Sequence, residues 1–399
     1  MQSNLVLQAN FVVTNVFAAA AGVYNGLFYP ATGVTEEAAG LIQLQLTAAG
    51  AYSGKIYMGG MPVSFIALPA QSFSAGGLAT NSVAGAPGGT IKVMFRVNSG
   101  SAPRTITGQV FGTNSIISNG IPVRGWTSDF TLYAGLGNSF ADARAYNFLI
   151  PPMNPIGDIY GPPGTNDNGG GSQGNGGPTG AHARRLSGSA TTFTGASPPG
   201  YGYGLLAINP NNANVVLSGA LADGTTFSQS VPVGEDNGIP FFAAFGSSAN
   251  EIIMGQLSLS DAATAPSGEV TWIRKASAAS LFPAGFTNAF VGVQGSYWSN
   301  SIMSGLIDDV LITNGGLEGS LLFTVASDGT KLVDWGTSNI VGSFNTNTGL
   351  FTINFQDNGR QTARGVVQQN AGLWGDGFFV VPSANPTDAG AITVQGLHP

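Results

Sequence analysis

Charged residues are scarce in this sequence. Only 8% of its 399 residues are Asp, Glu, Lys or Arg, whereas an average globular protein has roughly 25%. Thirteen basic and 20 acidic residues give a net charge of -7. The only adjacent basic pairs are Arg184-Arg185 and Arg274-Lys275, which are too few for the basic patch that nucleic-acid binding requires. We therefore expect no nucleic-acid partner.

Cysteine is absent and histidine nearly so. The lack of cysteine excludes disulfides, zinc–thiolate sites and thiol nucleophiles. The two histidines, His182 and His398, lie at the end of a Gly-rich segment and at the penultimate position, and no G-x-S-x-G motif accompanies them. Adjacent carboxylates such as Asp308 and Asp309 point to opposite faces of a strand, so they cannot both line one cleft. We therefore predict that the chain is not an enzyme.

Long apolar runs are also missing. No run approaches the roughly 18 residues of a membrane-spanning helix, so no membrane span is predicted. Because 43% of the residues are hydrophobic, the scarcity of charge does not indicate disorder. It indicates a surface of Ser, Thr, Asn, Gln and Gly, which suits dense self-association or a life outside the cell. We predict an extracellular or cell-surface location.

Alternation of apolar and polar residues is the main pattern that is present. It is clear at Ile42–Leu46 and recurs along the chain, as is typical of half-buried antiparallel strands. Sixty glycines mark turns and tight corners, with Asp223-Gly224 and Asn25-Gly26 among the turn candidates. The predicted fold is all-β, with antiparallel meanders that form two stacked sandwich-like or barrel-like halves. Helix is expected to be negligible, with short helical turns such as Thr35–Ala39.

Composition also suggests a domain organisation. Residues 1–21 are predicted to be an N-terminal extended arm or first strand, and residues 22–160 a first β domain. Residues 161–185 are a Gly-rich connection, because Gly161–Gly180 has the composition of a flexible linker. Residues 186–399 are predicted to be a second β domain.

Phrases that combine glycine with aromatic residues occur along most of the chain. They include GVYNGLF (Gly22–Phe28), GAYSGKIYMGG (Gly50–Gly60), ADARAYNFLIPP (Ala141–Pro152) and GDGFFV (Gly375–Val380). As a set, they resemble a glycine/aromatic-rich β-repeat domain of large predicted exported proteins of Verrucomicrobia-type bacteria, a family of unknown function. The resemblance implies export, an all-β repeat-like fold and no known enzymatic residues.

The N-terminal run LVLQANFVV is apolar, extended and uncharged. It is either the first strand of the sheet or an arm that adds to the sheet edge of a neighbouring copy. In the second case Leu5, Leu7, Phe11 and Val13 would form the self-assembly arm, and the chain would be a homo-oligomer or polymer. We therefore predict a non-enzymatic exported structural subunit that self-associates into a filament, sheath or surface layer.

A carbohydrate-binding or adhesive cell-surface module is the alternative. Exposed aromatic rings on sheets can bind glycans, and Tyr297 and Trp298 are candidates because adjacent strand positions expose one ring whichever is buried. Calcium is the only ion that the composition suggests, since carboxylates and turn carbonyls suit it. Its candidate ligands are Asp167, Asp308 and Asp309, and no other cofactor is predicted.

Overall fold

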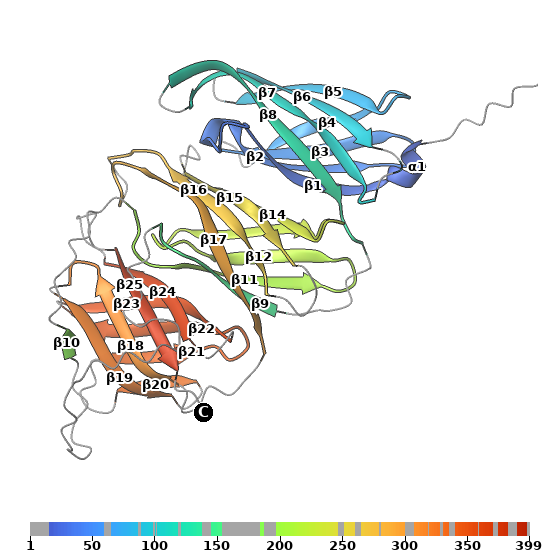
Figure 1. The fold of residues 1–399 in the computed structure, drawn as a ribbon. Coiled ribbons are helices and arrows are strands. Elements are labelled where there is room, and N and C mark those ends of the chain that lie inside the picture. The colour runs from blue at the N-terminus through green and yellow to red at the C-terminus, as the bar shows by residue number, and fades with distance from the viewer. Residues whose placement is uncertain are drawn as a thin grey trace, which may run out of the picture.

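The computed structural model shows three antiparallel sheets and almost no helix (Figure 1). The helices are α1 (Val16–Ala20) and the 3-10 helix η1 (Glu36–Ala38). The structure describes residues 16–59, 65–86, 89–98, 100, 102–118, 121–137, 145–153, 184–186, 197–245, 251–259, 265–278, 281–299, 307–317, 319–327, 330–334, 340–357, 359–369, 374–381 and 389–396. Within these ranges, no helix has the length and hydropathy that crossing a membrane requires.

The first unit (within residues 16–137) is an eight-stranded sheet in the order β4-β3-β2-β1-β8-β7-β6-β5. Its strands are β1 (Gly22–Tyr29), β2 (Gly40–Leu46), β3 (Ala51–Met58), β4 (Ile66–Ser72), β5 (Leu78–Ala86), β6 (Gly89–Asn98), β7 (Thr105–Ser118) and β8 (Ile121–Ala134). Helix α1 packs on the core of this unit. The ring of Phe17 lies 6.0 Å from that of Phe73, and the Tyr24 hydroxyl donates to the Ala20 carbonyl.

The second unit (within residues 145–153 and 197–299) is an eight-stranded sheet in the order β13-β12-β11-β9-β17-β16-β15-β14. Its strands are β9 (Ala145–Ile150), β11 (Gly202–Asn209), β12 (Asn214–Ala220), β13 (Thr226–Pro232), β14 (Gly238–Phe245), β15 (Glu251–Ser258), β16 (Ser267–Arg274) and β17 (Phe286–Trp298). One side chain links its two end strands. Gln229 of β13 donates to the Pro240 carbonyl and accepts from the Phe242 N–H of β14, both at 2.8 Å.

The third unit (within residues 184–186 and 307–396) is a nine-stranded sheet in the order β10-β19-β18-β25-β24-β23-β22-β21-β20. Its strands are β10 (Arg184–Leu186), β18 (Ile307–Asn314), β19 (Ser320–Ser327), β20 (Lys331–Asp334), β21 (Ile340–Phe344), β22 (Leu350–Gln356), β23 (Arg360–Gln368), β24 (Trp374–Val380) and β25 (Ala389–Gly396). Strand β19 also pairs with β20, so this sheet closes on itself.

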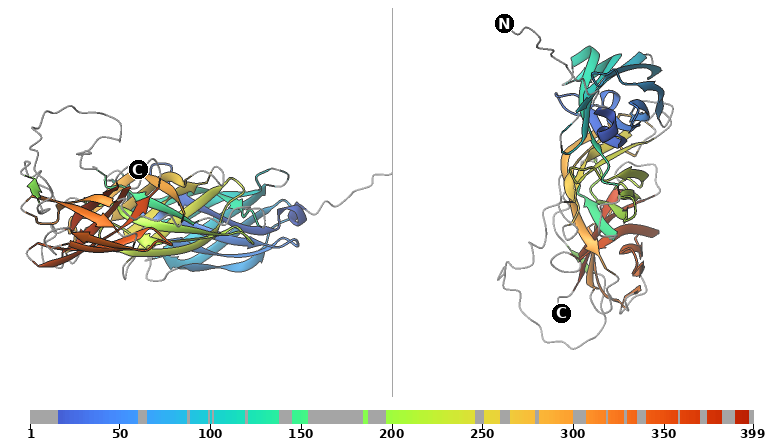
Figure 2. Two further views of the ribbon diagram at one scale, coloured as in Figure 1. Left: turned by 90° about the horizontal axis from the view of Figure 1, so that it is seen from below. Right: turned by 90° about the vertical axis from the view of Figure 1, so that its right-hand side faces the viewer.

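The three units follow one another along an elongated body (Figure 2). The all-β, antiparallel and helix-poor prediction is confirmed. The number of sheets is three, whereas the sequence suggested two halves. Residues 186–399, predicted to be one domain, contribute to two sheets, and β9, which precedes the Gly-rich segment, pairs with β11 and β17, which follow it. The described end of the predicted N-terminal arm, Val16–Ala20, is helical and not extended, and the helical turn at Thr35–Ala39 is present as η1.

Candidate functional site at the junctions between units

Several predicted site residues lie outside the described residues. These are Leu5, Leu7, Phe11 and Val13 of the self-assembly arm and the candidate calcium ligand Asp167. Their roles remain predictions.

The other two candidate calcium ligands, Asp308 and Asp309, lie on β18. The register of this strand against β25 shifts between Ile307 and Asp309, which marks an irregularity in the ladder. Among the described residues, no three His, Cys, Asp or Glu side chains come together in a way that could hold a metal ion.

The two candidate glycan-binding rings lie in different environments. Trp298 is 3% exposed, and although it belongs to β17 of the second unit it packs in the core of the third. Its Nε1 donates to the Thr346 carbonyl of the third unit at 2.9 Å. Tyr297 is 39% exposed, with its ring 6.1 Å from that of Tyr146. Burial of Trp298 leaves Tyr297 as the candidate binding ring, and makes Trp298 an anchor between two units.

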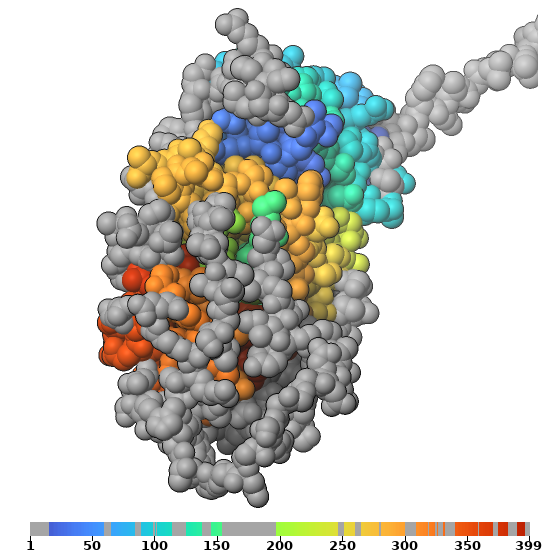
Figure 3. Space-filling view, turned by 60° about the vertical axis from the view of Figure 1, so that its left-hand side comes forward, coloured from blue at the N-terminus to red at the C-terminus, as the bar shows by residue number. Residues whose placement is uncertain are grey.

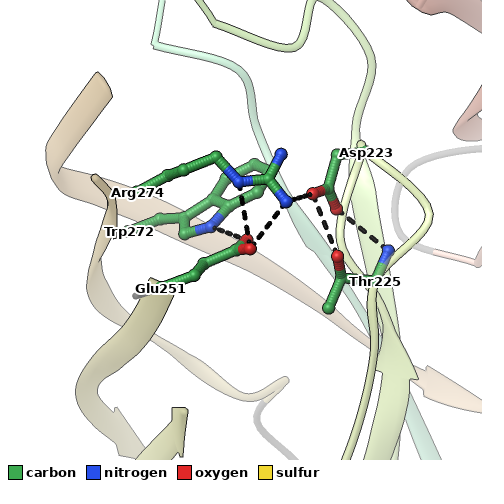
Figure 4. Close-up of polar contacts among 5 residues, drawn as sticks. All are labelled: Asp223, Thr225, Glu251, Trp272 and Arg274. Atoms are coloured by element: carbon green, nitrogen blue, oxygen red, sulfur yellow. Dashed lines mark hydrogen bonds and ion pairs between the residues drawn. The ribbon is translucent and has the colours of Figure 1, made fainter. Parts of the chain in front are cut away.

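Five polar or aromatic residues of the second unit form a compact cluster (Figure 4). Arg274, at the end of β16, places Nη2 2.7 Å from carboxylate oxygens of both Glu251 and Asp223. Trp272 Nε1 donates to the other Glu251 oxygen at 2.7 Å. The Thr225 N–H and hydroxyl both donate to Asp223 at 2.9 Å. One guanidinium therefore serves two carboxylates.

Burial and this excess of negative charge together raise the pKa of Glu251. The residue is 5% exposed, and burial is the largest cause that raises its pKa, followed by the nearby charge of Asp223. Arg274 and the hydrogen bond from Trp272 lower it again, but the pKa of Glu251 still rises from 4.5 to about 7. A carboxyl group in this position takes up a proton near neutral pH.

Lys275, the next residue after Arg274, extends to the first unit instead. Its Nζ lies 2.6 Å from Glu37 Oε1 and 3.2 Å from Glu36 Oε1. The Glu36 side chain is 2% exposed, and both of its carboxylate oxygens lack a well-aligned hydrogen bond among the described residues. Burial raises the pKa of Glu36 from 4.5 to about 7; Lys275 opposes this rise and Glu37 adds to it.

A second ionic contact joins the first two units, with the unit that supplies the cation reversed. Here the first unit supplies the cation, Arg104, and the second supplies the carboxylate, Glu235. The Arg104 Nε and main-chain N–H both donate to Glu235 at 2.7 Å, and Nη1 donates to the Ala21 carbonyl at 2.9 Å. The side chains of Arg104 and Glu235 are 36% and 21% exposed, so this contact is more accessible to water than Glu36 is.

Apolar packing is continuous across this first junction. Ala39 and Leu41 of the first unit belong to the same buried core as the strands of the second, and Leu27, Val34 and Tyr57 pack against it. Figure 3 shows the blue first unit lying directly against the yellow and orange second unit. The first and second units are therefore held by a shared core as well as by charge.

The hydrogen bonds that the described side chains form between the second and third units come from neutral groups. Asn147 Nδ2 donates to the Val367 carbonyl at 2.9 Å, and Gln368 Nε2 donates to the Gln294 carbonyl at 2.7 Å. The Trp298 indole lies in the same junction. Among the described residues, no ion pair crosses from the second unit to the third.

The oxygens of Glu251 and Asp223 are engaged by Arg274, Trp272 and Thr225 within the second unit. Sequence reasoning did not identify this cluster. Its visible signal was the adjacency of Arg274 and Lys275, but the sequence does not show which carboxylates converge on them.

Comparisons with known proteins add little. No family model and no curated protein matches the chain. Solved structures of transferrin binding protein B (TbpB) align with it: a double mutant of the vaccine antigen from Haemophilus parasuis Hp5 (10% identity, 95% of this chain, 76% of that chain, TM-score 0.19) and intact Ap-TbpB with its N and C lobes (9%, 94%, 76%, 0.19). TM-scores this low do not show a shared fold.

Proposed function

We propose that the chain is a non-enzymatic structural subunit, exported to the cell surface or beyond, which self-associates into a filament, sheath or surface layer. The observation that supports this most is the construction of both junctions. The first has a shared apolar core and ion pairs, and the second has an indole from one unit buried in the core of the next. Three units joined in this way form one elongated body, which suits a structural subunit.

The composition supports the same proposal. A protein with 8% charged residues repels copies of itself only weakly, because surface repulsion depends on charge. The glycine/aromatic phrases that resemble the exported β-repeat family point in the same direction. In this proposal the N-terminal run with Leu5, Leu7, Phe11 and Val13 adds to a sheet edge of a neighbouring copy.

The test compares the full chain with a variant that lacks residues 1–15. The deletion ends just before α1, so it keeps Phe17, which is buried against Phe73. We expect the full chain to form polymers, seen by size-exclusion chromatography with light scattering and by negative-stain imaging, and the variant to remain a folded monomer. A full chain that stays monomeric at high concentration would contradict self-association. A variant that still polymerises would contradict the role of the arm.

A carbohydrate-binding function is the second candidate because of Tyr297, whose ring is 39% exposed. The test is a glycan array with and without added calcium, using the wild type, Tyr297→Ala and a matched control, Tyr29→Ala, which removes another half-exposed tyrosine (47%). Saturable binding that only Tyr297→Ala abolishes would favour this function. Binding that both variants retain would exclude Tyr297 as the platform.

A further inference from the structure

Carboxylates outnumber cations at the contact of Lys275 with the first unit and in the second-unit cluster beside it. Arg274 and Lys275 are consecutive residues that extend to different partners, Arg274 to Glu251 and Asp223 and Lys275 to Glu36 and Glu37. We call these six residues the acidic junction cluster. Four carboxylates share two cations, and three of the four are 6% exposed or less.

Glu36 is the member of this cluster with the least compensation. Among the described residues, the charged groups that act on it are Lys275 and Glu37, and Lys275 lies closer to Glu37 than to Glu36. Gly59, directly after β3, packs so closely that a Cβ on it would lie 2.6 Å from the Glu36 Cγ and 2.8 Å from Ile252 of β15. Burial there disfavours the ionised carboxylate more than the protonated one, because the ion loses more solvation energy.

Around Glu251, too, carboxylates outnumber cations. Asp223 and Arg274 act on it, and Trp272 donates a hydrogen bond. Arg274 is shared with Asp223, so ionisation of Glu251 leaves a net negative charge beside the residue that leads into Lys275. The contacts of Glu251 and Glu36 are thus made by two consecutive residues, Arg274 at the end of β16 and Lys275 directly after it.

We propose that the acidic junction cluster is a proton-operated contact between the first and second units, closed when Glu36 and Glu251 are protonated and loosened when they ionise. In the loosened state η1 moves away from the end of β16. Water then reaches Glu36, and its solvation stabilises the ionised carboxylate. The contact between Arg104 and Glu235 has one cation for one carboxylate, so it holds while the other contact loosens. The pKa values of about 7 for Glu36 and Glu251 place the change near neutral pH. This inference does not depend on self-association.

The size of the effect follows from linkage. If Glu36 regains an ordinary pKa of 4.5 when the contact opens, instead of about 7 when it is closed, raising the pH from about 5.5 to about 8.5 increases the open-to-closed ratio about thirtyfold. Ionisation of Glu251 adds to this to the extent that opening also hydrates that group.

The absence of cysteine permits a direct measurement on the full chain. Ser82→Cys on β5 and Ser267→Cys on β16, both exposed positions, carry spin labels that report the distance between the first two units by double electron–electron resonance. Ser267→Cys with Ser343→Cys on β21 reports the neutral second junction. The labelled proteins are compared at a series of pH values from about 5.5 to about 8.5.

We expect the first distance distribution to gain a longer component at the higher pH, with a midpoint near 7, while the second stays unchanged. Glu36→Gln, which mimics the protonated side chain, should remove the part of the change that Glu36 supplies and leave at most the part that Glu251 adds. Glu269→Gln is the matched control, because it removes the same charge from an exposed position on β16, and it should titrate like the wild type. An identical first distribution at all of these pH values, an undiminished change in Glu36→Gln, or an equal change in the second pair would overturn the proposal.

Discussion

Global stability should fall as the pH rises from about 5 to about 8. The folded pKa of Glu36 is raised from 4.5 to about 7, so in this window the folded chain holds a proton that the unfolded chain has released. The stabilisation from this proton is complete below the unfolded pKa, decreases as the pH approaches 7, and is lost above it. For one such carboxyl group, the loss between about pH 5 and about pH 8 amounts to roughly 2–3 kcal/mol.

Little discounting for solvent applies at this position, because the Glu36 side chain is 2% exposed. Glu251, with its pKa also raised to about 7, contributes a second decrease in the same direction. The unfolding free energy of Glu36→Gln should depend less on pH than that of the wild type, because the contribution of Glu36 is missing. Glu251→Gln should likewise lack the contribution of Glu251. The exposed Glu269→Gln should leave the dependence unchanged.

The assay is urea unfolding, followed by circular dichroism and tryptophan fluorescence, at several pH values in this window. Urea is used because guanidinium would screen charges. Each variant is compared with the wild type at the same pH, so the titration of the remaining carboxylates largely cancels. If the difference in unfolding free energy between the wild type and Glu36→Gln does not change with pH, the assignment of a buried, protonated Glu36 is wrong.

Three further expectations concern the rest of the fold. Trp298→Phe removes the hydrogen bond to the third unit and should cost about 1 kcal/mol in urea unfolding; an unchanged stability would show that the bond is dispensable. Gln229→Ala frees the Phe242 N–H, whose hydrogen exchange should become about tenfold faster; unchanged exchange would contradict the link that this side chain makes between β13 and β14. Gly108→Ala would place a Cβ 1.9 Å from a main-chain oxygen and should cost about 2 kcal/mol, whereas Gly292→Ala, with open space around it, should cost far less.

The strands could be predicted because their signal is local. Ile42, Leu44 and Leu46 alternate with polar residues in the sequence, and all three are at most 2% exposed in β2. The turn at Asp223-Gly224 also follows from local chemistry, since Gly224 adopts a positive φ of 91°.

Glycine was less informative where it serves packing. Asn25-Gly26 was a turn candidate, but both residues lie within β1. Gly26 is required there because a Cβ would lie 2.3 Å from the Thr131 carbonyl oxygen of β8. A close approach between two strands more than a hundred residues apart leaves no local pattern, so the turn prediction was wrong at this position.

The junctions could not be predicted for the same reason. Lys275 meets a glutamate 238 positions away, and Trp298 enters the core of a unit other than its own. Both contacts depend on how whole sheets stack, which neither alternation nor turn chemistry determines. The sequence therefore indicated what each strand does within its sheet, but not how one sheet is attached to the next.

The contrast between the two junctions determines which solution conditions act on the molecule. Amides and indoles, which form the second junction, do not titrate in the ordinary pH range, whereas the first junction depends on carboxylates. Salt acts mainly on exposed charges, and hence more on Arg104 and Glu235 than on Glu36, which is almost completely buried. The buried carboxylates should therefore respond to pH more than to salt concentration. Because the ion pairs that the described residues form between units lie at the first junction, we expect a change in pH to act on that junction more than on the second.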